Sequence, residues 1–220
     1  YKGQFLGGFR HGNGELIGND NYHLVGNWFE GQIQGLGVET YPDGSVYKGE
    51  FVANLADGKG EIIYADGATY VGRWKSGEVD GKGISTYPNG MIYDGNFENG
   101  KIHGFGLMTF GDSYLYEGMW KDGERHGVGK VKYRDGTTYE GEFEAGQRSG
   151  NGVMQMQDGF EYSGQWLSGE MHGTGIAKYA NGDIYEGNFF AGRRQGQGTM
   201  TYYTGAVTGG TWTEGALEAD

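Results

Sequence analysis

Residues 116–138 read YEGMWKDGERHGVGKVKYRDGTT, and this stretch decides the fold. Tyr116, Gly118 and Trp120 alternate with Glu117 and Met119, which is the two-residue period of a strand with one buried face. Residues 127–133 continue the same period on a second strand. Asp-Gly at 135–136 predicts a tight hairpin turn, with both turn residues at positive φ. The stretch is therefore predicted to form one β-hairpin.

The same pattern recurs along the whole chain with a constant step of 23 residues and no insertion or deletion. We number positions 1–23 within each unit. Position 3 is Gly in all ten units, and positions 12 and 14 are Gly in all nine complete units. The units begin at Tyr1, Leu24, Tyr47, Tyr70, Tyr93, Tyr116, Tyr139, Tyr162, Tyr185 and Thr208.

Position 5 is always a large aromatic, with Phe and Trp in alternate units. Glycine normally weakens a strand, so its fixed places need a reason. We expect glycines at positions 3, 12 and 14 to leave space for rings to lie over bare backbone, with the next unit's ring covering the exposed edge. The predicted structural ladder contains Trp28, Phe51, Trp74, Phe97, Trp120, Phe143 and Trp166.

The pattern Tyr-x-Gly-x-Trp/Phe-x-x-Gly-x-x-x-Gly-x-Gly resembles the MORN (membrane occupation and recognition nexus) repeat, and the resemblance covers the whole chain. Departures include Leu24 for Tyr, Asn54 and Asn21 for Gly, and Met156 for the usual aromatic at position 18. Asn tolerates a left-handed backbone, whereas Ser113 at the turn glycine predicts a distorted turn.

We therefore predict an all-β fold: an elongated, single-layer antiparallel β-hairpin solenoid of nine repeats plus a half repeat, forming one array over residues 1–220. Stacked hairpins share a continuous core in such a fold, because one hairpin alone is marginal. The chain begins inside a repeat, so we expect it to be part of a longer protein.

The composition excludes several classes of function. A net charge of −12 argues against nucleic acid as a partner, because phosphate binding needs clustered cations. The chain has no cysteine, hence no disulfide and no Cys-based zinc site. No apolar run is long enough for a membrane-spanning helix. The stretch 127–130, Gly-Val-Gly-Lys, lacks the spacing of a phosphate-binding loop.

The histidines suggest a metal site only at first sight. His103 and His126 both occupy position 11, in adjacent units, which places them about 10 Å apart by the strand spacing. One zinc ion needs both nitrogens at about 2.1 Å. We therefore expect no metal, cofactor or catalytic site within one chain and predict that the protein is not an enzyme. A metal shared between two chains is left open.

Two surfaces are candidates for binding. The unit from Tyr116 is rich in basic residues, although acids lie among them, and about 1 kcal/mol per cation could hold it near an anionic surface. The residues predicted to contact a lipid head group are Lys121, Arg125, Lys130, Lys132 and Arg134. The last units are more apolar, and we predict that they pair two copies about a two-fold axis. The predicted dimer interface consists of Phe189, Phe190, Met200, Tyr202, Tyr203 and Trp212.

The favoured function is a non-enzymatic scaffold that forms an antiparallel homodimer and organises a cytoskeletal or membrane-proximal assembly. Its resemblance to the all-repeat cytoskeletal scaffolds of protozoan parasites implies scaffold proteins as partners and a cytoplasmic, cytoskeleton-associated location. One alternative is a module that binds phosphoinositides or another phospholipid. A second is a dock for a partner helix or peptide in the aromatic groove around Tyr133 and Tyr179.

Overall fold

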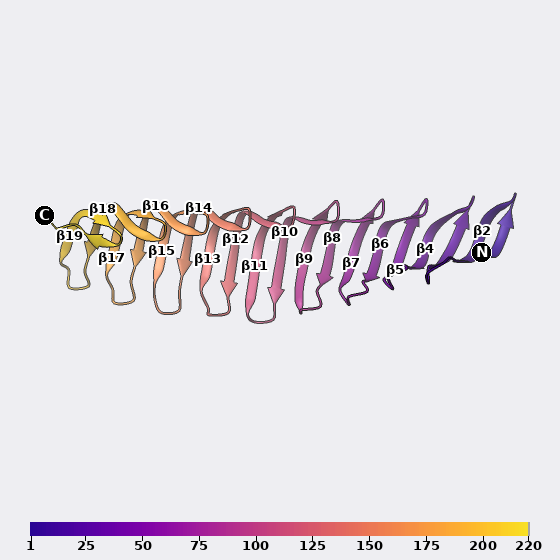
Figure 1. Ribbon diagram of the computed structural model, residues 1–220, viewed down its shortest axis with the longest axis horizontal. Helices are drawn as coiled ribbons and strands as arrows, with labels where there is room; N and C mark the ends of the chain where they lie inside the picture. The colour runs from indigo at the N-terminus through magenta and orange to yellow at the C-terminus, as the bar shows by residue number, and fades with distance from the viewer. Residues whose placement is uncertain (220) are drawn as a thin grey trace. The chain divides into compact units, whose positions relative to one another are not determined.

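The computed structural model describes residues 1–219, and these residues form antiparallel β-strands with no helix. Within this part of the chain there is accordingly no helix long and apolar enough to cross a membrane. The chain divides into two compact units, Tyr1–Phe110 and Gly111–Asp220. Below, the word unit means one of these two, and the 23-residue elements are called repeats. Figure 1 shows that consecutive strands follow one another as hairpins within each unit. The predicted all-β hairpin solenoid is confirmed, whereas nothing tests the prediction of one array.

In the first unit each strand pairs with the next one along the chain. The strands are β1 Lys2–Leu6, β2 Phe9–Ile17, β3 His23–Phe29, β4 Gln32–Thr40, β5 Val46–Val52, β6 Leu55–Ile63, β7 Thr69–Lys75, β8 Glu78–Thr86, β9 Met91–Glu98 and β10 Lys101–Phe110.

The second unit has the same arrangement. Its strands are β11 Tyr114–Lys121, β12 Glu124–Tyr133, β13 Thr138–Glu144, β14 Gln147–Gln155, β15 Glu161–Leu167, β16 Glu170–Lys178, β17 Ile184–Phe190, β18 Arg193–Thr201, β19 Val207–Thr213 and β20 Ala216–Leu217.

The core of each unit is a ladder of rings on one face of the sheet, as predicted. Tyr47 is fully buried and meets Phe51 of its own repeat and Trp74 of the next edge-on, with ring centroids 5.1 and 4.9 Å apart. Its hydroxyl donates to the carbonyl of Glu50 at 2.9 Å. The same contacts recur at Tyr139 in the second unit. Each tyrosine therefore joins two successive repeats and satisfies its own polar group.

Glycines at positions 3 and 14 provide the predicted space for these rings. A Cβ on Gly60 would lie 2.4 Å from Cε2 of Tyr47, and one on Gly49 would lie 2.4 Å from the hydroxyl of the same ring. Position 12 has a different role, so the prediction was wrong there. Gly58 has a φ of 110° and lies at an irregularity in the pairing of β5 with β6. Its glycine supplies a left-handed backbone at a β-bulge.

The turns also differ from the prediction. At Asp43-Gly44 only the glycine has positive φ, and the Asp43 carboxylate accepts a hydrogen bond from the backbone N–H of Ser45 at 2.8 Å. The turn with two positive-φ residues lies at the other end of the hairpin, for example at Ala53-Asn54, with φ of 50° and 71°. Short side chains that hydrogen-bond to the nearby backbone favour the turn at Asp43-Gly44. Residues that tolerate positive φ favour the turn at Ala53-Asn54.

The expected departures in the turns are confirmed. Asn21 replaces the turn glycine and adopts a φ of 66°. Ser113 does not take the left-handed conformation, which Gly111 adopts instead with a φ of 50°. The turn therefore takes its positive φ at Gly111, because glycine adopts that region without a steric penalty.

Candidate interaction surfaces

The side chain at position 10 covers part of the ring ladder, because it lies over the aromatic ring at position 5 of the following repeat. In four repeats this side chain is an arginine. Arg148 lies 4.4 Å from the centroid of Trp166 and donates from Nη2 to the carbonyl of Gly169 at 2.6 Å. The same pair of contacts is made by Arg10, Arg125 and Arg194. These guanidinium groups are half-buried and belong to the core.

This arrangement corrects the predicted lipid site. Arg125 is committed to the ring of Phe143 and to the carbonyl of Gly146, so it is not a free cation on the surface. Lys130 is exposed but pairs with Glu140 at 3.0 Å. Lys121, Lys132 and Arg134 are also exposed, as the lipid site requires. They lie on different parts of the hairpin: Lys121 beside its tight turn, Lys132 and Arg134 toward the loop after β12.

The residues of the predicted dimer interface separate into two sets. Phe189, Met200 and Trp212 are each only 4% exposed, because they belong to the ring ladder and its covering layer. They therefore offer no surface to a partner while the repeats remain folded. Phe190 and Tyr203 are 60% and 74% exposed, and Tyr202 is partly exposed. Phe190 ends β17, whereas the two tyrosines follow β18, so the structure does not gather them into one patch.

The histidines at position 11 contact residues of their own hairpin or of the following repeat. His103 lies 3.3 Å from a carboxylate oxygen of Glu98. The rings of His11 and His172 pack at an angle against Phe29 and Phe190, at 5.5 and 5.3 Å. No group of three or more His, Asp or Glu side chains within the described residues could hold a metal ion.

The aromatic groove of the second unit exists as a shallow hollow of about 660 Å³ beside the loops. Tyr179 lines it and contacts the ring of Phe160 at 5.6 Å. Four methionines also line it, together with three charged side chains: Met154, Met156, Met171 and Met200, and Asp158, Asp183 and Arg194. Tyr133 lies outside this hollow and lines another one, of about 670 Å³, with Ser113. Tyr133 and Tyr179 were predicted to line the same groove, but only Tyr179 lies in the methionine-lined hollow.

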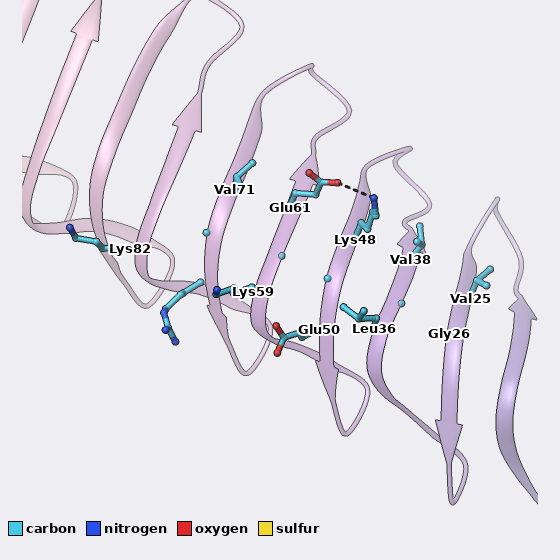
Figure 2. Close-up of a pocket in the computed structure, with 15 residues that line it drawn as sticks. Val25, Gly26, Leu36, Val38, Lys48, Glu50, Lys59, Glu61, Val71 and Lys82 are labelled. Carbon is cyan, nitrogen blue, oxygen red and sulfur yellow. Dashed lines mark ion pairs between the residues drawn. The ribbon is translucent and has the colours of Figure 1, made fainter.

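A second groove, which the sequence did not predict, crosses β3–β8 on the face opposite the ring ladder. It has a volume of about 750 Å³ and runs over glycines at positions 3 and 14. Figure 2 shows Val38, Glu61 and Val71 along one side of these glycines. Leu36 and Lys59 lie along the other side. Alternation along each strand explains the two walls: positions 2 and 15 form one, and positions 4 and 13 form the other.

Charge is unevenly distributed between the two walls of this groove, which we call the glycine groove. On the first wall Lys48 pairs with Glu61 at 3.7 Å. The second wall carries one acid, Glu50, and three exposed cations, Lys59, Arg73 and Lys82. None of these cations has an ion-pair partner within residues 1–219. Lys59 and Arg73 face each other directly across β6 and β7. Like charges in such a pair repel one another.

Two of these features have a signal in the sequence that the motif pattern alone does not reveal. Arginine recurs at position 10 in four repeats, at residues 10, 125, 148 and 194. A cation at a fixed place in a repeat is a sign of a structural contact. The glycine groove could have been found by reading positions 2, 4, 13 and 15 as walls, since all four point away from the tyrosines.

These features define a protein of repeated antiparallel hairpins, whose open surfaces are available for binding. A family model described as MORN repeat matches residues 1–21, 25–46, 47–69, 70–92, 93–113, 116–138, 139–160, 162–184 and 185–207. The chain belongs to the MORN repeat family. Membership indicates a protein-interaction or membrane-associated module, and it points to a non-enzymatic repeat protein.

Other known proteins add little to this assignment. A search of the curated proteins found no match. Among solved structures, the wild-type TCP10 domain of Danio rerio CPAP is similar, with a TM-score of 0.46, 14% identity, and coverage of 88% of this chain and 91% of that domain. The G-box domain of the microcephaly protein CPAP has a TM-score of 0.41, 12% identity, and coverage of 92% and 100%.

Proposed function

We propose that this chain is a non-enzymatic scaffold that forms an antiparallel homodimer through its C-terminal repeats. In this role it organises a cytoskeletal or membrane-proximal assembly in the cytoplasm, with scaffold proteins as its other partners. The observation that carries the proposal is the exposure of large apolar side chains around the loop between β18 and β19. Tyr203, in this loop, is 74% exposed, and Val207, the first residue of β19, is 63% exposed.

The start of β19 lies beside these side chains. Val207 pairs with Thr201 of β18, and the loop that contains Tyr203 joins the two strands. A two-fold axis near this loop would bring Tyr203 and Val207 of both copies together, so that each copy covers the apolar side chains of the other.

Mass determination in solution tests the dimer. Multi-angle light scattering of the 24.0 kDa chain should give twice that mass at micromolar concentration. Val207→Lys should return it to the monomer mass, because it places a charge within the proposed apolar interface. Ile184→Lys is the matched control, since Ile184 occupies the same position of the preceding repeat in a strand paired on both sides. A wild-type monomer, or equal effects of the two lysines, would contradict the proposal.

Phospholipid binding is a second candidate, favoured by the exposed cations Lys121, Lys132 and Arg134. None of the three has an ion-pair partner in the region that the structure covers. Vesicles that contain phosphoinositide should then bind the chain at low salt and release it at high salt. Reversal of these three charges should abolish binding and leave the dimer mass unchanged. Binding that survives the reversal would exclude this site.

Helix docking is the third candidate, and the methionine-lined hollow around Tyr179 favours it. Methionine side chains adapt to varied apolar partners. An amphipathic helix held there should bind independently of salt and be lost on Tyr179→Ala. Tyr133→Ala serves as the comparison, because Tyr133 lies outside this hollow.

A further inference from the structure

We propose that the glycine groove binds an acidic peptide segment of a partner protein in the polyproline II conformation. This inference rests on the proposed role as an interaction scaffold, and it concerns a different surface from the proposed dimer interface. The groove crosses six strands, β3–β8, so its length is about 24 Å at the usual strand spacing. About eight residues of a polyproline II segment would fill it.

The distance after which the groove walls repeat matches the pitch of a polyproline II helix, and this match favours that conformation of the ligand. The two walls repeat once per hairpin, every two strands, which is about 9.6 Å. A polyproline II helix has three residues per turn and advances about 9.3 Å in one turn. Every third side chain of such a peptide therefore meets the same position of the next repeat. A β-strand of three residues has a similar length but presents the opposite face. An α-helix advances about 10.8 Å in two turns and loses register with the walls.

The floor of the groove favours a narrow ligand. Val71 and Arg73 lie two residues apart on β7 with only Gly72 between them, so their Cα atoms are separated by about 7 Å. Glycine leaves the backbone bare between the walls. An extended chain can approach that backbone closely, whereas an α-helix about 10 Å wide would rest on the tips of the side chains.

The walls indicate the chemistry of the ligand. Lys59 and Lys82 occupy position 13 of successive repeats, one hairpin period apart, and Arg73 lies between them along the chain. These three exposed cations have no ion-pair partner in the described residues, and the same wall carries one acid, Glu50, so its net charge is positive. On a chain of net charge −12, such a wall is suited to carboxylates of the partner. The other wall carries Val38 and Val71, 37% and 55% exposed. The ligand should therefore place an acidic residue on one of its three faces and an apolar residue on the next.

A synthetic peptide with the repeated triplet Glu-Leu-Pro, labelled with fluorescein, is the probe. Its anisotropy should rise on titration with the full chain, and raised salt should weaken the binding. A peptide of the same composition in shuffled order should bind at least about tenfold more weakly, because its carboxylates no longer follow the hairpin period. Equal affinity of the two peptides, or no binding of the first, would overturn the proposal.

Charge reversal locates the site on the protein. Combined Lys59→Glu, Arg73→Glu and Lys82→Glu should weaken binding of the probe by about tenfold or more. The control is combined Lys75→Glu and Lys101→Glu, which changes exposed cations outside the groove and should preserve affinity. Val71→Ser should weaken binding without changing its salt dependence. A control as damaging as the groove variant would contradict the assignment.

Two further measurements separate this inference from other occupants. If the groove held a second copy of the chain, the groove variant would lose the dimer mass, and the proposal would be overturned. If the cations served a membrane, vesicles of phosphatidylserine would displace the peptide from the wild type, which would also overturn it. Retention of the dimer mass together with loss of the peptide would support the groove. A dimer that never binds the probe would leave the scaffold intact and disprove this ligand.

Discussion

The guanidinium carbon of Arg148 lies 4.4 Å from the ring centroid of Trp166, which is one repeat further along the chain. The indole Nε1 of Trp166 donates in turn to the carbonyl of Gly152 at 3.1 Å. Trp28 and Trp212 make the same bond, and each also lies under an arginine. An arginine at position 10 therefore joins two successive repeats in two ways. Its charge interacts with the aromatic ring of the next repeat, and its planar guanidinium group donates to a backbone carbonyl of that repeat.

Removal of this arginine should destabilise the protein. Arg148→Ala is expected to lower the free energy of unfolding by about 2 kcal/mol, because a cation–π contact and a charge-assisted hydrogen bond are lost together. Arg148→Lys should recover only part of the loss, since an ammonium group lacks the planar fork. Urea titration followed by tryptophan fluorescence measures both. Arg193→Ala, at an exposed neighbouring position, should change stability by less than about 0.5 kcal/mol.

Within residues 1–219, Trp74 lacks both the arginine and the hydrogen bond, and its site offers a stabilising substitution. The Nε1 of Trp74 is buried without a hydrogen-bond partner in the described residues, and position 10 of the preceding repeat is Ala56. Ala56→Arg should add a cation over the ring and raise the free energy of unfolding by about 1 kcal/mol. The indole proton of Trp74 should then exchange more slowly with solvent. Ala56→Leu covers the ring without a charge, and an equal gain from it would contradict this explanation.

Two glycine substitutions should differ in cost because the glycines have different roles. Gly60→Ala forces a methyl group against the ring of Tyr47 and should cost about 3 kcal/mol. Gly67→Ala meets no atom within 4 Å but must adopt a φ of 87°, at a cost of about 1 to 2 kcal/mol. Tyr47→Ala should make Gly60→Ala nearly neutral. Chemical denaturation of the four variants checks the order, and equal costs in the two tyrosine backgrounds would refute the steric explanation.

The buried tyrosines predict loss of stability at alkaline pH. Burial raises the pKa of Tyr70, Tyr116 and Tyr162 from 10.0 to about 12. The unfolded chain loses these protons first, so stability is complete below pH 10 and falls as the pH rises toward 12. Absorbance of tyrosinate and circular dichroism should change together in that range. Tyr70→Phe should reduce the slope of stability against pH, and an unchanged slope would count against the ladder as its source.

Much of the fold follows from the residues of one repeat. The alternation around Tyr116 and Trp120 gave the strands and the buried face correctly, because a two-residue period allows only one face to be apolar. The turn types were assigned wrongly, since Asp-Gly is compatible with more than one hairpin turn. Only the backbone around Asp43-Gly44 distinguishes them. The dimer and lipid residues stay predictions, except that Arg125, Phe189, Met200 and Trp212 have their side chains in the core.

The sequence by itself determined the repeat, its 23-residue register and the ladder of rings, because periodicity and side-chain volume are written in the chain. Tertiary structure alone decided which charges are free. Arg125 and Lys59 are both cationic. The Arg125 guanidinium lies over the ring of Phe143, whereas the Lys59 side chain lines the open glycine groove. The difference arises because positions 10 and 13 point to opposite faces of the sheet, and an aromatic ring of the following repeat lies within reach of the cation only on the ladder face.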